Sequence, residues 1–254
     1  MIPRTASPFI RNGGNAMKLL EMNTIDFQEY VRSNDAVIIP SGAFEIWGPH
    51  LPVGADTIIA EEIANRLADR MGWLVGPTVS VGDSLLSWGP GAVTVYPDNF
   101  RNYLEDVCLS LVKHGIRRFC FINPHVGNVP LIGQVACALK TEHGAESCVF
   151  DWWRFIQPLC ADILDGEGMM AHGHASEAGT SLFLYLRPEL VKTDRLLRTE
   201  PKKVNAFPDV QVFWSISDVS DTAMIGDATK ASREKGEKIV EKALERMTEF
   251  LRQW

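Results

Sequence analysis

The feature that most constrains this sequence is a repeated alternation between short apolar runs and longer stretches with an apolar residue every three or four positions. The apolar runs are 36–42, 74–81, 117–123 and 147–153, and the stretches that follow them are 57–71, 98–114, 129–140 and 154–164. Continuous apolar runs of this length are typical of strands buried on both faces. Strands that alternate with helices of ten to fifteen residues indicate βαβ units. The sequence therefore predicts an α/β domain with three layers, in which helices cover both faces of a mostly parallel central sheet.

Two further helices are expected toward the C-terminus, at 172–186 and 229–254. No internal repeat and no linker interrupts the pattern, so 18–254 is interpreted as a single domain. Residues 1–17 lack the apolar core of a signal peptide and are expected to be a loose N-terminal extension.

Composition excludes several classes of protein. Of 254 residues, 46% are apolar and 22% are charged, which is typical of a globular chain. No apolar run reaches the length of a membrane helix, so no membrane span is expected. The net charge of −7 argues against a nucleic-acid surface, which needs clustered Lys and Arg. The five cysteines are an odd number without a C-x-x-C pair, which favours a reducing, cytoplasmic compartment.

Polar side chains gather in loops that follow the predicted strands. The first loop carries Glu45, His50 and Asp56, and a second loop, INPHVGN, carries His125. A third segment, HGHASEAGTS, contains His174 and Glu177. Ligands bind at the carboxyl ends of parallel strands, so these side chains are expected to converge. Two carboxylates and an imidazole suit a divalent metal such as Zn²⁺ or Mn²⁺, and Fe²⁺ also fits this donor set.

Each of these residues also has a simpler interpretation. Asp56 stands at the N-cap position of the helix expected from 57, where a carboxylate accepts backbone N–H bonds. His50 and His125 could organise their loops through hydrogen bonds. His174 could be a helix-entry residue bonded to the backbone. Spacing alone leaves these alternatives open.

The segment G-x-x-E-x-x-G-P-H-L-P-x-G-x-D, from Gly42 to Asp56, resembles the signature of the creatininase family of metal hydrolases. Four later blocks are similar to that family's blocks and occur in the same order. They are GPGAVTV (89–95), INPHVGN (122–128), HASEAGTS (174–181) and IGDATKASREKGE (225–237). The resemblance covers nearly everything from residue 18 onward.

The resemblance implies an α/β/α domain, assembly as a homohexamer, and a site that usually holds two metal ions. The ligands of the first ion match Glu45, Asp56 and His125. The second ion normally takes a histidine two residues after that glutamate, where this chain has Trp47. An indole offers only an N–H donor and cannot bind a cation. Gly127 and Gly179 also stand where carboxylates are found in the family. We therefore expect one divalent metal per chain, with Trp47 filling the volume of the second.

The resemblance also assigns roles around the metal. His174 matches the histidine that moves protons near the substrate, and Glu177 is expected to orient His174 or to act as a base. Substrate contacts are expected from Trp47, His50, Ser84 and Trp153, with a loop-bracing role for His50 as the alternative.

The function implied is metal-assisted hydrolysis of a small polar cyclic substrate, in which activated water attacks an amide or lactam carbonyl. Two alternatives stay open. One is ring-opening C–C hydrolysis of an oxidised inositol or sugar. The other is a non-catalytic scaffold that keeps the fold alone.

Overall fold

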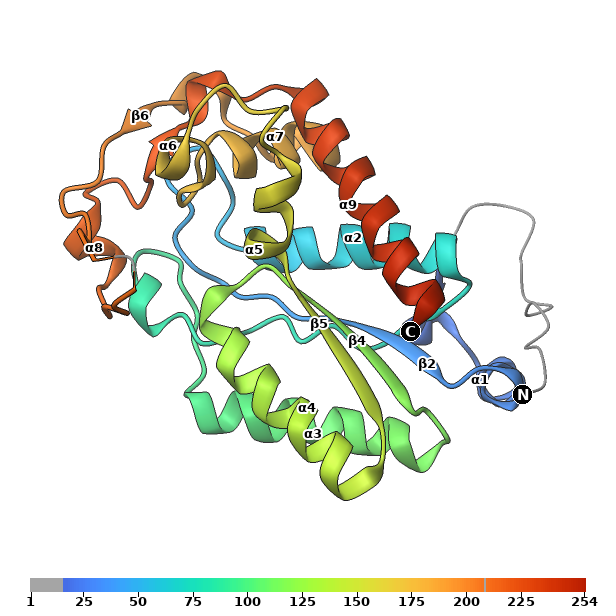
Figure 1. Cartoon of the computed structure of the whole chain (residues 1–254). Coiled ribbons are helices and arrows are strands. Elements are labelled where there is room, and N and C mark those ends of the chain that lie inside the picture. The colour runs from blue at the N-terminus through green and yellow to red at the C-terminus, as the bar shows by residue number, and fades with distance from the viewer. Residues whose placement is uncertain (1–15, 208) are drawn as a thin grey trace.

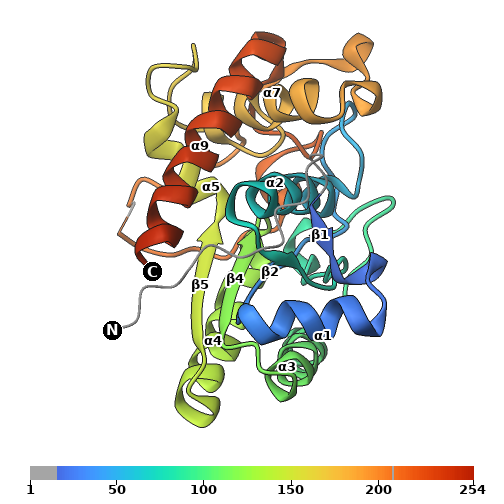
Figure 2. The ribbon, with the colours of Figure 1, turned by 90° about the vertical axis from the view of Figure 1, so that its right-hand side faces the viewer.

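A computed structural model describes residues 16–207 and 209–254. Five strands form one parallel sheet in the order β1-β3-β2-β4-β5. Helices cover both faces of the sheet, as Figures 1 and 2 show from two directions. The predicted three-layer α/β/α architecture is confirmed. The strands are β1 (Met17–Lys18), β2 (Ala36–Pro40), β3 (Leu74–Val75), β4 (Arg118–Asn123), β5 (Glu146–Asp151), β6 (Arg198–Thr199) and β7 (Gly226–Asp227). The α-helices are α1 (Thr24–Ser33), α2 (Ala55–Met71), α3 (Pro97–Lys113), α4 (Val129–His143), α5 (Trp152–Ile156), α6 (Gly168–His172), α7 (Glu177–Leu186), α8 (Ile216–Val219) and α9 (Arg233–Gln253).

Strand β2 lies at the centre of the sheet, and all five of its residues are buried. Because successive side chains of a strand point to opposite faces, Ile38 packs into one core and Ile39 into the other. The core with Ile38 lies under α2, α7 and α9, and the core with Ile39 lies under α1, α3 and α4. This double burial explains why the strand has no polar position.

The carboxyl ends of β2, β4 and β5 lie at the same edge of the sheet because these neighbouring strands are parallel. The loop after β2 runs to α2, the loop after β4 contains His125, and β5 leads directly into Trp152 of α5. Short bridges from Ser41 to Val79 and from Phe44 to Val93 extend the sheet into the loops. This edge therefore holds the loops that the sequence singled out.

Some local expectations differ from the structure. The N-cap residue of α2 is Gly54, so Asp56 lies inside the first turn and does not cap the helix. The strand expected at 74–81 is only the two residues of β3, because the chain then turns away to make single bridges. Met17, expected in the loose extension, belongs to β1 and pairs with Leu74 of β3. Residues 1–15 of that expected extension lie outside the described residues. Among the described residues, no helix is both long and apolar enough to cross a bilayer.

Candidate active site

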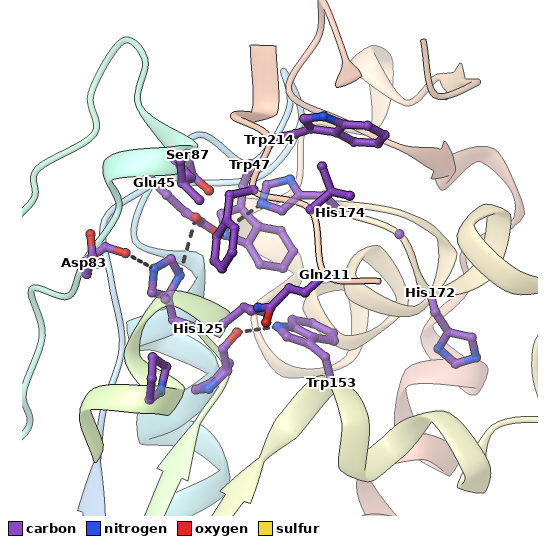
Figure 3. Close-up of a pocket in the computed structure, with 18 residues that line it drawn as sticks. Glu45, Trp47, Asp83, Ser87, His125, Trp153, His172, His174, Gln211 and Trp214 are labelled. Carbon is purple, nitrogen blue, oxygen red and sulfur yellow. Dashed lines mark hydrogen bonds and ion pairs between the residues drawn. The ribbon is translucent and has the colours of Figure 1, made fainter. Parts of the chain in front are cut away.

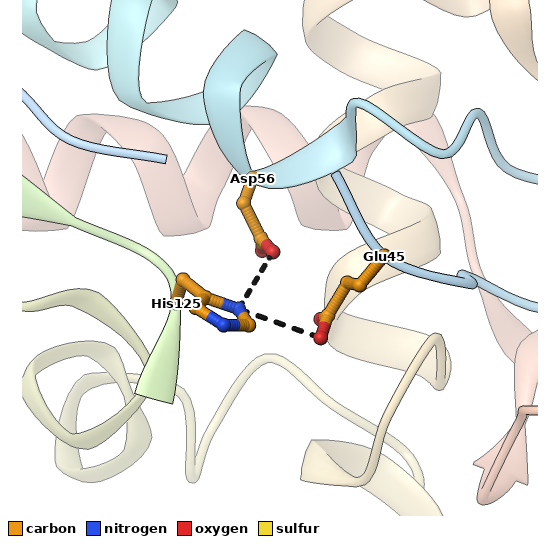
Figure 4. A group of neighbouring side chains, drawn as sticks. All are labelled: Glu45, Asp56 and His125. Carbon is orange, nitrogen blue, oxygen red and sulfur yellow. Dashed lines mark hydrogen bonds and ion pairs between the residues drawn. The ribbon is translucent and has the colours of Figure 1, made fainter. Parts of the chain in front are cut away.

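Glu45, Asp56 and His125 come together at the carboxyl edge of the sheet. Their potential ligand atoms all lie within 4.8 Å of one another, and Figure 4 shows the three side chains facing a common point. All three are buried, with exposures of 4%, 0% and 4%. Among the described residues this is the sole group of three or more such side chains with metal-binding geometry. The convergence predicted from the loops is present.

His125 is oriented so that one ring nitrogen faces the carboxylates. Its Nδ1 lies 3.1 Å from Asp56 Oδ2 and 3.4 Å from Glu45 Oε2. Its Nε2 lies 2.6 Å from the backbone carbonyl oxygen of Asp83. A carbonyl oxygen can only accept, so Nε2 carries the proton and donates it. This arrangement fixes the ring and leaves Nδ1 facing Glu45 and Asp56, as is usual for a histidine that binds a metal.

The two carboxylates are incompletely satisfied by the protein. Glu45 Oε2 and Asp56 Oδ1 are buried and have no hydrogen-bond partner among the described residues. Burial raises the pKa of Asp56 to about 7, and the neighbouring Glu45 carboxylate adds to the rise. Burial acts in the same direction on Glu45, but His174 and His125 hold the pKa of Glu45 well below its usual value. Buried acceptors without donors are costly, and a divalent cation between them would remove that cost. The donor set therefore fits a metal ion.

His174 contacts the same cluster from the opposite side. Its Nε2 lies 2.9 Å from Glu45 Oε1, and its Nδ1 lies 3.0 Å from the carbonyl oxygen of Ala223. Burial lowers the pKa of His174, but the Glu45 carboxylate, the Ala223 carbonyl and Asp56 together outweigh it, and the net shift is upward. Both ring nitrogens face acceptors, so the protonated ring is favoured. His174 is thus placed to give up a proton beside the cluster.

A cavity of about 590 Å³ opens over Glu45, His125 and His174 (Figure 3). Both aromatic and polar side chains line it. The aromatic ones are Trp47, Trp153, Phe213 and Trp214, and the polar ones include Asp83, Ser87, His172 and Gln211. The Nε1–H of Trp153 donates to the carbonyl oxygen of Pro124, which fixes that indole at the end of β4. The cavity is therefore a preformed pocket next to the candidate metal ligands.

Trp47, which stands where the resemblance to the family predicts a ligand of a second metal, lines the pocket. It is only 2% exposed, and its ring centroid lies 4.8 Å from that of His174 and 5.5 Å from that of Trp153. A Cβ atom added to Gly179 would lie 3.0 Å from Trp47 Cζ3. A larger residue at 179 would thus press on the indole. The indole therefore packs directly over Gly179.

Gly127 is required for a different reason. A Cβ atom there would lie 2.2 Å from the carbonyl oxygen of Asp83 and 2.9 Å from His125 Nε2. Any side chain would break the hydrogen bond that orients His125. A carboxylate at 127 is therefore incompatible with this placement of the Asp83 loop.

Three of the expected site residues have other roles in the structure. Glu177 is fully buried and is absent from the pocket wall; its carboxylate accepts bonds from the backbone N–H groups of Asp165 and Gly166 and from Lys235 Nζ. With its oxygens held in this way, it neither contacts His174 nor faces the pocket. We therefore correct its expected catalytic role to that of a structural anchor between α7 and α9.

His50 and Ser84 are also buried outside the pocket wall. His50 Nε2 lies 2.9 Å from Thr180 Oγ1, so His50 braces α7, which was the alternative interpretation. Ser84 is 1% exposed, and its neighbours Asp83 and Ser87 face the cavity instead. The substrate-contact prediction was wrong for both. Trp47 and Trp153 do line the pocket, as expected.

Sequence reasoning missed the carbonyl of Asp83 and the segment from Gln211 to Trp214. Asp83 is held by Asn128, whose Oδ1 accepts the Asp83 N–H and whose Nδ2 donates to the carbonyl of Gly42. Asn128 is the last residue of the INPHVGN segment, and its type alone does not predict this role. The contribution of Asp83 comes from its backbone, which leaves no signal in residue type. The 211–214 segment lies in an irregular region whose path no periodicity reveals.

Comparison with known proteins agrees with the site. The family model described as creatinine amidohydrolase, Creatininase, matches residues 20–251. The chain is 29% identical over 252 residues to creatinine amidohydrolase from Pseudomonas putida, covering 92% of this chain and 95% of the relative. It is 26% identical over 254 residues to mycofactocin precursor peptide peptidase from Mycobacterium ulcerans strain Agy99, covering 92% and 91%. It is also 26% identical over 254 residues to 3-dehydro-scyllo-inosose hydrolase from Thermotoga maritima, covering 91% and 81%.

Solved structures extend the likeness to three dimensions. A creatininase mutant of the zinc–zinc type has a TM-score of 0.84 at 25% identity and covers 94% of this chain and 98% of its own. A manganese form of creatininase has a TM-score of 0.83 at 25% identity, with the same coverage. The family model spans nearly the whole chain, and the fold and ligand cluster agree with it. The chain belongs to the creatininase family of hydrolases.

Proposed function

We propose that this hydrolase uses one divalent metal ion, Zn²⁺ or Mn²⁺ with Fe²⁺ as a further fit, to cleave an amide or lactam C–N bond in a small polar cyclic substrate. The observation that carries the proposal is the buried cluster beside a preformed pocket, in which Glu45 Oε2 and Asp56 Oδ2 face His125 Nδ1. Glu45 Oε2 and the other Asp56 oxygen, Oδ1, have no hydrogen-bond partner among the described residues. The solved zinc and manganese forms of creatininase support the choice of metals.

Glu45, Asp56 and His125 would hold the ion. A divalent cation bound there would supply Lewis acidity toward a carbonyl oxygen and lower the pKa of water. The Asp83 carbonyl keeps His125 in the required tautomer through its bond to Nε2. Glu45 has a double task, since its other oxygen accepts from His174.

His174 would move the proton in the reaction. Its Nδ1–H is anchored on the carbonyl of Ala223, and its Nε2 proton lies beside the pocket. Transfer of that proton to the departing nitrogen would let the C–N bond break without forming an amide anion. The proton that the attacking water gives up would return to the imidazole, and Glu45 would stabilise the resulting imidazolium between turnovers.

Trp47 and Trp153 would orient the substrate and exclude water. Their ring centroids are 5.5 Å apart, and both border the cavity next to His174. Flat aromatic walls suit a flat amide or lactam ring, because aromatic faces stack on planar groups. Because the Trp47 side of the pocket is occupied by an indole, the reaction would take place on the side of Glu45, Asp56 and His125.

A second candidate is the ring opening of an oxidised cyclitol, in which water adds to a ketone and a C–C bond breaks. The similarity to the Thermotoga maritima inosose hydrolase favours it, since that relative matches over 91% of this chain. The non-catalytic scaffold is set aside, because the chain is a family hydrolase with an intact cluster at Glu45, Asp56 and His125.

A substrate screen separates the two chemistries. Protein reconstituted with Zn²⁺ or Mn²⁺ would be incubated with lactams, cyclic ureas and ketocyclitols, with His174→Gln as the matched control. We expect a new carboxylate together with a freed amine or amide nitrogen. A carboxylate formed only from ketocyclitols would select the second candidate. Metal-loaded protein that acts on neither class would contradict both.

Assembly and location complete the proposal. We expect a homohexamer that works in the cytoplasm on a small molecule, without nucleic-acid or membrane partners. Sedimentation at micromolar concentration tests the assembly, and a monomer would refute it.

A further inference from the structure

A second hollow borders the active-site pocket. An open groove of about 390 Å³ lies beside the pocket, and four residues line both: Leu86, Ser87, Val212 and Trp214. The remaining wall is mostly apolar, from Met169, Val204, Ile216, Val219 and Ile225. Ser87, Lys203 and Asn205 are the polar residues of the groove wall, and the other lining residues are apolar.

The size of the pocket exceeds the needs of a single ring. A ring of about eight non-hydrogen atoms fills roughly 150 Å³, the volume of about five waters, whereas the pocket alone measures about 590 Å³. Cavities of 300–1,000 Å³ are typical of drug-sized ligands. A substrate with one small polar ring would leave most of the space to water.

Charge is sparse along the groove. Lys203 is its one charged lining residue among those described, and its Nζ lies 3.6 Å from Asp218 Oδ1 and 5.9 Å from the centre of the Trp214 ring. The lysine is thus occupied by a carboxylate and an aromatic face. An extended ligand would meet apolar surface here and no unpaired charge.

We propose that the substrate carries an apolar arm of several carbons, which runs from its hydrolysable head past Leu86 and Trp214 into this groove. The inference rests on the proposed function for the identity of the head, and it assigns Val204, Val212 and Val219 to recognition of the arm. The exposed apolar side chains beside the groove fit this assignment: Val204 is 65% exposed and Val212 is 43% exposed. Surface of this kind is commonly a binding site.

Linear alkyl hydroxamates test the arm without requiring turnover. The hydroxamate group binds a metal ion at the head position, and the alkyl chain is lengthened from two to ten carbons. Calorimetry on the zinc-loaded protein gives Kd for each. Burial of methylenes is expected to tighten Kd by about fourfold each. The first carbons lie in the pocket, and the later ones enter the groove.

Val219→Trp fills the groove, and Val204→Trp narrows its exposed mouth if the first variant fails to fold. In either variant we expect Kd to stop tightening at a shorter chain than in the unaltered protein. The matched control is Val210→Trp, the same change at a half-exposed residue that lines neither cavity. This control should keep the full chain-length dependence.

The outcomes separate the two proposals. Binding of every hydroxamate with no chain-length dependence overturns the arm and leaves the hydrolase proposal intact. Chain-length dependence that Val219→Trp and Val204→Trp leave unchanged also overturns it. If sedimentation shows that Val219→Trp loses both assembly and chain-length dependence, the groove is a contact between copies and the arm is refuted. Failure to hydrolyse any lactam or ketocyclitol, with the dependence intact, overturns the function alone.

Discussion

The two sides of the active-site pocket differ in what the chain has placed there. One side carries Glu45, Asp56 and His125, with carboxylate oxygens that the protein leaves without donors. The other side carries Trp47 packed over Gly179, at positions where the resemblance to the family predicts ligands of a second ion. The first side has buried acceptors that a cation would satisfy, and the second side is occupied by an indole. The comparison teaches that a large residue and a glycine can pack as a pair directly beside a cluster of carboxylates.

The largest expected effect comes from removing a member of the Glu45–Asp56–His125 cluster. Asp56→Ala removes a proposed ligand, so the amount of bound metal should fall to background. Activity should fall on the order of 10³-fold, because metal assistance contributes several kcal/mol. Metal analysis and steady-state kinetics check this. Asp98→Ala is the control, since Asp98 also lies in the first turn of a helix but on the surface. An Asp56→Ala protein that retains stoichiometric metal would show that the ligand assignment is wrong.

His174 contacts the charged side without belonging to the cluster. His174→Gln removes the mobile proton, so kcat should fall by about 10²-fold or more while the metal content stays the same. His143→Gln, at the exposed end of α4, controls for the loss of an imidazole. Unchanged kcat, or loss of the metal along with activity, would contradict the proton-transfer role.

A double-mutant cycle tests the packing of Trp47 on Gly179. Gly179→Glu places a side chain against Trp47 Cζ3, so it should lower the free energy of unfolding by about 1–3 kcal/mol through overpacking. In the Trp47→His background the cost should shrink, because the indole is gone and the new carboxylate has an imidazole beside it. Denaturant unfolding of the four proteins measures the coupling. Additive effects would mean that Trp47 and Gly179 do not pack as a unit.

His50 supports α7, the helix that contains Gly179, through its hydrogen bond with Thr180. Burial lowers its pKa to about 4, below the ~6.5 of an unfolded chain. The unfolded chain therefore binds the proton first, so the stability that His50 contributes is complete above pH 6.5 and is lost as the pH falls toward 4.

Allowing for solvent screening, we expect the loss to be on the order of 1–2 kcal/mol. Unfolding of the metal-free protein at several pH values, compared with His50→Gln, isolates this contribution. The variant should be less sensitive to acid between pH 6.5 and 4. If acid lowers the free energy of unfolding equally in the two proteins, His50 does not cause the loss.

Much of the fold followed from periodicity, because a strand buried on both faces leaves no polar position, as β2 shows. The convergence of Glu45, Asp56 and His125 was also predictable, since parallel strands end at one edge, whereas their choice as metal ligands came from the resemblance to the family. Glu177 could not be placed, because a buried carboxylate can face a substrate or a lysine, and only packing of α7 on α9 brings Lys235 to it. The role of the Asp83 carbonyl could not be predicted, because every residue has a backbone carbonyl and the residue type carries no signal of its use.

The metal content of the purified protein tests the central claim most directly. The protein would be loaded with excess Zn²⁺ or Mn²⁺, dialysed, and analysed for metal and for chain concentration. One tightly bound ion per chain is the predicted result, with Trp47 and Gly179 occupying the second position. Two tightly bound ions per chain would contradict the account, because the filled side of the pocket would then hold a cation.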